Sequence, residues 1–367
     1  MFDEVGQVHF FTAIVALIVG WLVLQCMSLS SSPVVASVPA EPTEAAAEVT
    51  APVITLASAV ATMRAQPDDA RIAEINLEFL LSRLSADAED KNVKDDDDVN
   101  SFVPTAVVTA MRAHAAEATV AKSGCAVIAI ISKKSLAGKR AAVDARAPGA
   151  VVEAMRSCAR DATVARMGCA ALFNIATNFI DGQQAAVDEG APKSAVDAMR
   201  MFTGDAGVAL EGCSALAAIA SLPSGRQAAV DAGAPEVIVA AMLTNASNSL
   251  IQQSGCEALA NIVNNLLAGH RAAIAAAASA AVVSAMRAFV DDADVADHGC
   301  LALNNFAVLP AGKAAVIAAG GREAITRAIE KHNMEHLQRL GRNALMLLER
   351  TVVSPGSERR LVEEIIN

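Results

Sequence analysis

Glycine–cysteine pairs recur along this chain at an almost constant interval. The five pairs begin at Gly124, Gly168, Gly212, Gly255 and Gly299, so the spacings are 44, 44, 43 and 44 residues. A second glycine series keeps the same step at Gly138, Gly182, Gly225, Gly269 and Gly312. A methionine precedes every pair at one fixed spacing, at Met111, Met155, Met199, Met242 and Met286. Because three markers hold one phase, we expect stacked copies of a single structural unit.

One unit, residues 225–267, shows how its helices are separated. Gly233 is the residue type that ends a helix, and Pro235 fits the first turn of the next one. The polar residues 244–249 then turn the chain into a third helix with an apolar stripe at helical spacing, formed by Ile251, Cys256, Leu259, Ala260 and Val263. Each unit is therefore predicted to hold a short, a medium and a long helix.

The first and last units keep the phase but lose the markers. Met63 precedes Asn76 by the same fixed spacing, and Leu77 takes the cysteine position. Near the other end Gly341 is followed by Arg342 instead of cysteine. Altered end units are what a stacked array requires, because its outermost faces meet water.

This set of features resembles the armadillo repeat family. The similarity lies in the endings of the first helices (Val187–Pro192 and Val230–Pro235) and of the third helices (Phe173–Ile175, Ala260–Ile262 and Asn304–Phe306). It implies an all-α, right-handed superhelix of about six to seven repeats over residues 52–352.

The resemblance also implies where a partner would bind. In that family the third helices line a groove for extended peptides, often held by asparagines, and the matching positions here include Asn174, Asn261 and Asn305. One and two turns earlier on the same face stand Glu257 and then Lys122, Arg166, Gln253 and Asp297. This charge order suggests a peptide that is acidic towards the first units. The alternative is that the asparagines only stabilise the array.

The import receptors of that family carry a tryptophan one turn before the asparagine. No aromatic residue stands at those positions here, so recognition of basic nuclear-localisation peptides is not expected.

An apolar N-terminal segment, residues 1–31, precedes a Ser/Pro/Ala/Glu-rich linker at 32–51. Residues 8–29 lack charges and would measure about 33 Å as a helix, enough to cross a bilayer. We predict a single-pass transmembrane anchor with the repeat domain in the cytosol. A cleaved signal or targeting segment is the alternative, although Asp3 and Glu4 are unlike its usual basic start.

Two features resemble reactive sites but are interpreted as structural. The repeated cysteines stand one per unit, and helices about 8–10 Å apart are too distant for disulfides. His332, Glu335 and His336 match a zinc hydrolase motif, but repeat phase places them near a turn, whereas the motif needs one helix. No catalytic residue, metal ligand or cofactor site is predicted.

The net charge of −11 argues against nucleic acid as a partner. Much of it lies in an expected acidic loop at 85–100, and residues 353–367 form an expected C-terminal tail. The sequence therefore favours a non-catalytic protein-binding scaffold at a membrane. A soluble receptor that carries a cargo peptide is the alternative, with a zinc hydrolase third.

Overall fold

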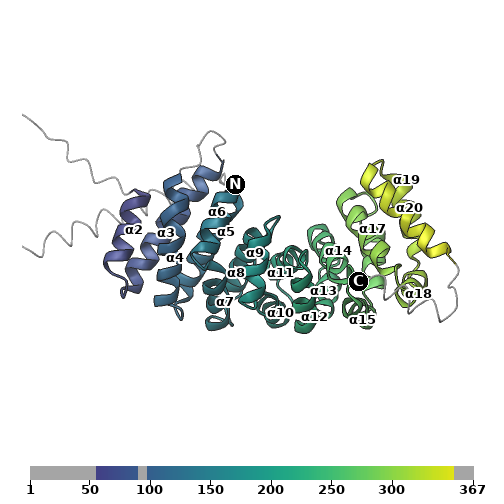
Figure 1. The fold of residues 1–367 in the computed structure, drawn as a ribbon, viewed down its shortest axis with the longest axis horizontal. Coiled ribbons are helices and arrows are strands. Elements are labelled where there is room, and N and C mark those ends of the chain that lie inside the picture. The colour runs from purple at the N-terminus through teal and green to yellow at the C-terminus, as the bar shows by residue number, and fades with distance from the viewer. Residues whose placement is uncertain (1–54, 90–96, 351–367) are drawn as a thin grey trace, which may run out of the picture. The chain divides into compact units, whose positions relative to one another are not determined.

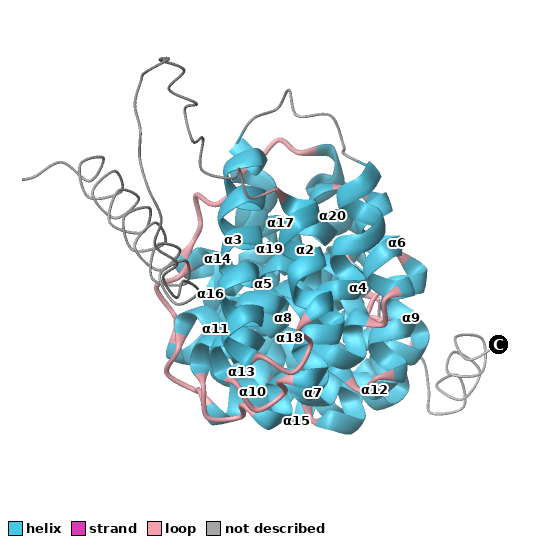
Figure 2. Ribbon diagram, turned by 90° about the vertical axis from the view of Figure 1, so that its left-hand side faces the viewer, coloured by secondary structure: helices cyan, strands magenta, loops and turns pink. Residues whose placement is uncertain are grey.

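The computed structural model describes residues 55–89 and 97–350, and every regular element within these two ranges is a helix (Figure 2). The chain divides into two units, residues 1–53 and 54–367. All that follows concerns the second unit. The predicted anchor at 8–29, its linker and the C-terminal tail at 353–367 lie outside the described residues.

Five complete three-helix units confirm the predicted repeat. Their first helices are α6 (Leu136–Asp144), α9 (Ile180–Asp188), α12 (Pro223–Ala232), α15 (Leu267–Ala275) and α18 (Pro310–Ala318). Their second helices are α7 (Ala147–Ser157), α10 (Ala191–Met201), α13 (Ala234–Thr244), α16 (Ala278–Ala288) and α19 (Gly321–Lys331). Their third helices are α8 (Ala162–Ala176), α11 (Ala206–Ile219), α14 (Ser249–Val263), α17 (Ala293–Phe306) and α20 (Glu335–Glu349).

Two shorter units precede these five. They consist of α2 (Leu56–Ala65) with α3 (Ala70–Glu89), and α4 (Asp97–Ala113) with α5 (Ala118–Lys134). Helix α4 continues on the N-terminal side of Pro104, whereas the equivalent Pro148, Pro192 and Pro235 lie in the first turn of their helices. Since α3 runs to Glu89 and α4 begins at Asp97, the acidic segment expected as a loop at 85–100 is largely helical where it is described.

Like helices of successive units pack side by side, as the colour order in Figure 1 shows. The long helix α3 contacts α5, and from α5 to α20 each third helix contacts the third helix of the next unit. From α4 to α19, each second helix likewise contacts the second helix of the next unit. The first helices α6, α9, α12, α15 and α18 form the remaining column. Any residue that recurs once per unit is therefore repeated along one column.

Short polar residues start most of the third helices. The side chains of Asp161, Asp205, Asn248 and Asp292 each accept hydrogen bonds from backbone N–H groups in the first turn. These N–H groups have no partner within the helix, so such a cap stabilises its start by about 1 kcal/mol.

The turn between the first and second helices needs a left-handed residue in every complete unit. Gly190, Gly233 and Gly320 take this conformation without steric cost, and Gly233 confirms the predicted helix end. Arg146 and Ala277 adopt the same conformation with φ near +57° and +56°. The backbone turn is thus kept even where glycine is absent.

The fixed spacing between methionine and glycine reflects a contact between the second and third helices. A Cβ atom on Gly124, Gly168, Gly212, Gly255 or Gly299 would lie 2.5–2.6 Å from the Cγ atom of the methionine of its own unit. The following cysteines are all fully buried. Glycine is therefore required because the methionine side chain crosses the third helix where a Cβ would stand.

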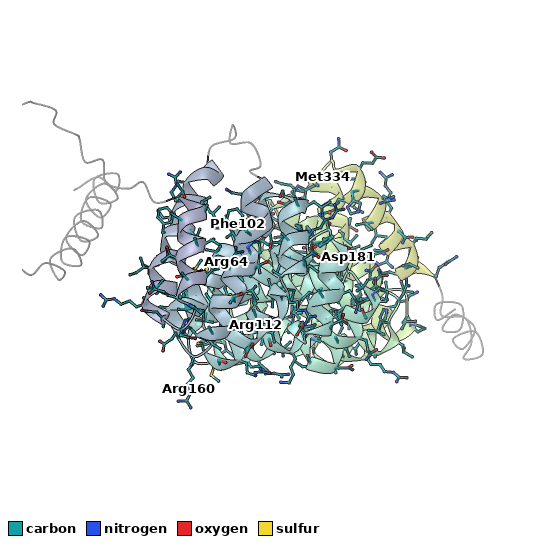
Figure 3. The ribbon with its side chains drawn as sticks, turned by 60° about the vertical axis from the view of Figure 1, so that its left-hand side comes forward. Arg64, Phe102, Arg112, Arg160, Asp181 and Met334 are labelled. Carbon is teal, nitrogen blue, oxygen red and sulfur yellow. The ribbon has the colours of Figure 1, made fainter. Side chains whose placement is uncertain are left out.

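An arginine follows four of these methionines, and two of these arginines join successive units. Arg112, labelled in Figure 3, donates from Nη2 to the carbonyl oxygen of Arg146 at 3.3 Å. Arg287 makes the same 3.3 Å contact to Gly320. Both acceptors are left-handed residues of the next unit, so these two arginines have a structural contact.

Sequence reasoning missed a polar residue that follows each glycine of the second series. Gln183 donates to the carbonyl oxygen of Ala176 at 3.1 Å, and Arg226 reaches three carbonyls, including that of Asn264 at 3.1 Å. Lys139 and Lys313 donate to the carbonyls of Thr177 and Arg350. All these acceptors lie at the C-terminal ends of third helices, where donors and positive charge are favourable.

Among the described residues, no single helix is both long and apolar enough to cross a membrane. Only α15 and α16, taken together across a bend of 69°, reach the required length and composition.

We expect Gly225→Ala to lower the thermal unfolding midpoint, with a loss of about 2 kcal/mol or more. The added Cβ would lie 2.0 Å from the backbone oxygen of Ile219, which cannot move as a side chain can. Circular dichroism during heating measures the shift. Gly204→Ala is the control because nothing lies within 4 Å of its Cβ, and equal losses in both variants would contradict the close approach.

His270 on α15 follows Gly269 and so stands where the other units have Lys139, Gln183, Arg226 or Lys313. It is only 5% exposed, and burial lowers its pKa from 6.5 to about 4. As the pH falls, His270 is therefore protonated in the unfolded chain before it is protonated in the folded one. Its buried neutral form contributes fully to stability above pH 6.5, and this contribution is lost as the pH drops towards 4. We expect a loss on the order of 2 kcal/mol. In His270→Gln, unfolding measured across this range should lose that part of its pH dependence. Gln183→His should add a similar dependence.

Candidate binding surface

The predicted site residues lie on the third helices of four units. Lys122 is on α5, Arg166 and Asn174 are on α8, Gln253, Glu257 and Asn261 are on α14, and Asp297 and Asn305 are on α17. Helix α11 lies between α8 and α14 and contacts both. The face formed by these residues on α5, α8, α11, α14 and α17 is called the third-helix surface below.

The three asparagines make the same contact in three units. The Nδ2 atoms of Asn174, Asn261 and Asn305 donate to the carbonyl oxygens of Ala129, Ala217 and Ala260 at 3.2, 3.0 and 3.0 Å. Each acceptor belongs to the preceding third helix, so the asparagines do join successive units. An amide has two N–H donors and an acceptor oxygen. One donor is used in each case, and the half-buried side chains keep capacity for a further contact.

Two of the five equivalent positions hold apolar residues. Ile130 on α5 is half-buried, and Ala218 on α11 is buried. Helix α11 instead presents Ser214, whose hydroxyl donates to the hydroxyl of Ser254 on α14 at 3.1 Å. The amide series is therefore interrupted at α11 and uninterrupted over α14 and α17.

The α5 and α8 end of the surface is basic, with one carboxylate that sequence reasoning missed. Arg166 is exposed and extends towards α11, where a Cβ on Gly207 would lie 2.6 Å from its Cδ atom. Glu211 on α11 is half-buried, and burial raises its pKa although Arg166 and Lys133 act in the opposite direction. Its place two residues before a repeated cysteine was the signal that could have identified it.

The α14 and α17 end is acidic, but a histidine of the next unit accompanies each carboxylate. His336 on α20 lies with Nδ1 at 2.9 and 3.0 Å from the two carboxylate oxygens of Asp297. The Nε2 atom of His298 lies 4.0 Å from Glu257. The asparagine at the α17 position is also engaged, because Asn304 donates to Asn305 Oδ1 at 3.2 Å.

The zinc-type motif does not lie on one helix. His332 follows the end of α19, with Nε2 3.0 Å from the carbonyl oxygen of Val290, whereas Glu335 and His336 begin α20. Met334, labelled in Figure 3, separates the two parts. His336 is instead paired with Asp297, so the two histidines serve different contacts.

The repeated cysteines are unsuited to nucleophilic chemistry. Burial raises the pKa of Cys125 and Cys213 to about 12, and burial followed by the Asp297 charge does the same for Cys300. It also raises the pKa of Cys169 and Cys256. Since the thiolate is the reactive form, these side chains act as small apolar groups.

Two cavities lie on either side of α10, lined mainly by residues of second helices. The cavity between α7 and α10 measures about 340 Å³ and that between α10 and α13 about 280 Å³, and Phe202 lines both. They are short gaps between second helices, whereas an extended peptide would need a long continuous surface.

No family model matches the sequence, and no curated protein matches it. Solved structures do. An engineered protein is 26% identical with a TM-score of 0.58, over 67% of this chain and 98% of that one. A designed armadillo repeat protein in complex with the peptide (KR)4 is 21% identical with a TM-score of 0.56, over 68% of this chain and 100% of that one. A structure of computationally designed armadillo repeat proteins for modular peptide recognition is 22% identical with a TM-score of 0.55, over 67% of this chain and 99% of that one. The chain therefore has an armadillo-like repeat fold.

Proposed function

We propose that this armadillo-like chain is a non-catalytic scaffold that holds an extended segment of another protein on its third-helix surface. The observation that carries the proposal is the repeated amide. Asn174, Asn261 and Asn305 are each fixed to the preceding helix through one donor, and each keeps a second N–H donor at the same repeat position, at intervals of one or two units.

An amide repeated at this interval suits a peptide backbone. Neighbouring helix axes are about 8–10 Å apart, and an extended chain advances about 3.3 Å per residue, so two or three peptide residues correspond to one unit. Side-chain amides can donate to and accept from peptide groups irrespective of sequence. Neighbouring side chains on the third helices would then set specificity.

The charges on the surface define the segment that fits. Lys122, Lys133 and Arg166 surround the α5 and α8 end, whereas Glu257 and Asp297 mark the α14 and α17 end. The partner segment is therefore acidic towards the first units and basic towards the last. The solved neighbours support the general mode, because some of them were designed for peptide recognition and one holds the peptide (KR)4.

The double variant Asn261→Ala, Asn305→Ala should weaken peptide binding about tenfold or more, because two amide contacts to the backbone are lost. The probes are two peptides of about 16 residues, a length suited to five units. Both contain one Asp/Glu block and one Lys/Arg block, in opposite orders. Fluorescence anisotropy with the full chain in detergent gives the affinities.

Asn245→Ala is the matched control for this double variant. It also removes one amide-to-carbonyl hydrogen bond, of 2.9 Å to Ala241, but at the end of a second helix. Peptide affinity should be unchanged in this control. Unchanged affinity in a folded double variant, or equal affinity of the wild-type chain for the two block orders, would refute the assigned surface or its charge order.

We further propose that residues 8–29 hold this scaffold at a membrane as a single transmembrane helix, with the repeat domain in the cytosol. The support is the length and apolar character of the segment. A soluble receptor that has lost this segment by cleavage is the competing possibility.

Alkaline carbonate extraction should leave the full chain in the membrane pellet and release a variant that lacks residues 8–29. The reason is that a transmembrane helix resists extraction, whereas peripheral contacts do not. The mass of the mature chain is measured in parallel. A mature mass without the N-terminal segment, together with full release by carbonate, would favour the soluble receptor.

A further inference from the structure

Two side chains of α20 reach the third-helix surface on α17. His336 contacts both carboxylate oxygens of Asp297, and Asn343 donates from Nδ2 to Asn304 Oδ1 at 2.7 Å. His336 and Asn343 are seven residues apart, so they lie two turns apart on one face of α20. Helix α20 therefore contributes more than an apolar cover to the preceding unit, to which α17 belongs.

The contact from Asn343 continues to the candidate binding residue. Asn304 donates from Nδ2 to Asn305 Oδ1 at 3.2 Å, and Asn305 donates to the carbonyl oxygen of Ala260 at 3.0 Å. The amide of Asn305 is thus held at both its oxygen and its nitrogen. Among the described residues, Asn174 and Asn261 are held at the nitrogen alone.

Holding an amide at both ends has a consequence for binding. The terminal torsion of asparagine has broad preferences, so a less constrained amide must be ordered when a ligand binds. The hydrogen bonds that run from Asn343 through Asn304 to Asn305 are called the relay below. Asn304 is only 9% exposed, which shields the relay from competing water and strengthens its hydrogen bonds. Asn305 is therefore ordered before any peptide arrives.

We propose that Asn343, acting through Asn304, is a positioning residue for Asn305, and that the α17 position consequently contributes more to peptide binding than the α14 position. This inference rests on the proposed function. It assigns a role to the capping helix α20 that its place at the end of the array does not by itself suggest.

Asn343→Asp tests the relay with almost no change in shape. The carboxylate can only accept a hydrogen bond, so Asn304 turns its donor towards residue 343 and withdraws it from Asn305. The probe is the one of the two charged-block peptides described above that the wild-type chain binds more tightly. Its affinity should fall about threefold to tenfold. Asn333→Asp is the control, because it adds the same charge in the same unit at an exposed position outside the relay, and it should leave the affinity unchanged.

A double-mutant cycle separates positioning from a general effect on stability. In an Asn305→Ala background, Asn343→Asp should cause no further loss, whereas in an Asn261→Ala background the full loss should remain. An equal loss in both backgrounds, or an equal effect of Asn333→Asp, would overturn the positioning role.

A second readout needs no peptide. In a ¹H–¹⁵N spectrum of the full chain in detergent, Asn343→Asp should shift the side-chain NH₂ signals of Asn304 and Asn305 and leave that of Asn261 in place. Unmoved Asn305 signals would show that the relay is absent even if peptides bind. Failure of both block peptides to bind the wild-type chain would instead reject the proposed function, and the positioning role with it.

Discussion

The array depends on how closely the second and third helices of each unit approach one another. A methionine of the second helix lies across the glycine of the third, at a distance that leaves no space for a Cβ atom. The adjacent cysteine fills the remaining interior with a small, fully buried side chain. This contact recurs in five units, and close packing of this kind tolerates little change in volume.

Close packing also fixes the spacing between units, and the spacing creates the surface. Because third helices contact third helices throughout the array, a residue that recurs at one repeat position forms a line across several units. The amides of Asn174, Asn261 and Asn305 are such a line, and each is attached to the helix before it. One N–H donor of each amide therefore supports the stack, and the second donor remains for a possible partner.

The two ends of the third-helix surface differ in how their polar groups are satisfied. At the α5 and α8 end, Arg166 extends over Gly207 towards a half-buried Glu211. At the α17 end, side chains from α20 contact Asp297 and continue through Asn304 to Asn305. The last unit therefore both closes the apolar interior and orders the residues beside it, which relates the stability of the array to the arrangement of its surface.

The near-constant period of the glycine and cysteine markers was enough to predict a stack of three-helix units, because each marker has a local cause: a close approach between helices or a buried small residue. The same phase placed Asn174, Asn261 and Asn305 at equivalent positions. The sequence did not identify Glu211, the relay from Asn343 or the histidines beside Glu257 and Asp297. These contacts join residues of neighbouring units that lie far apart in the chain, and each depends on which side chains two separate helices bring together. Only the tertiary structure decides that, because periodicity describes what the units share, whereas these contacts come from what differs between them.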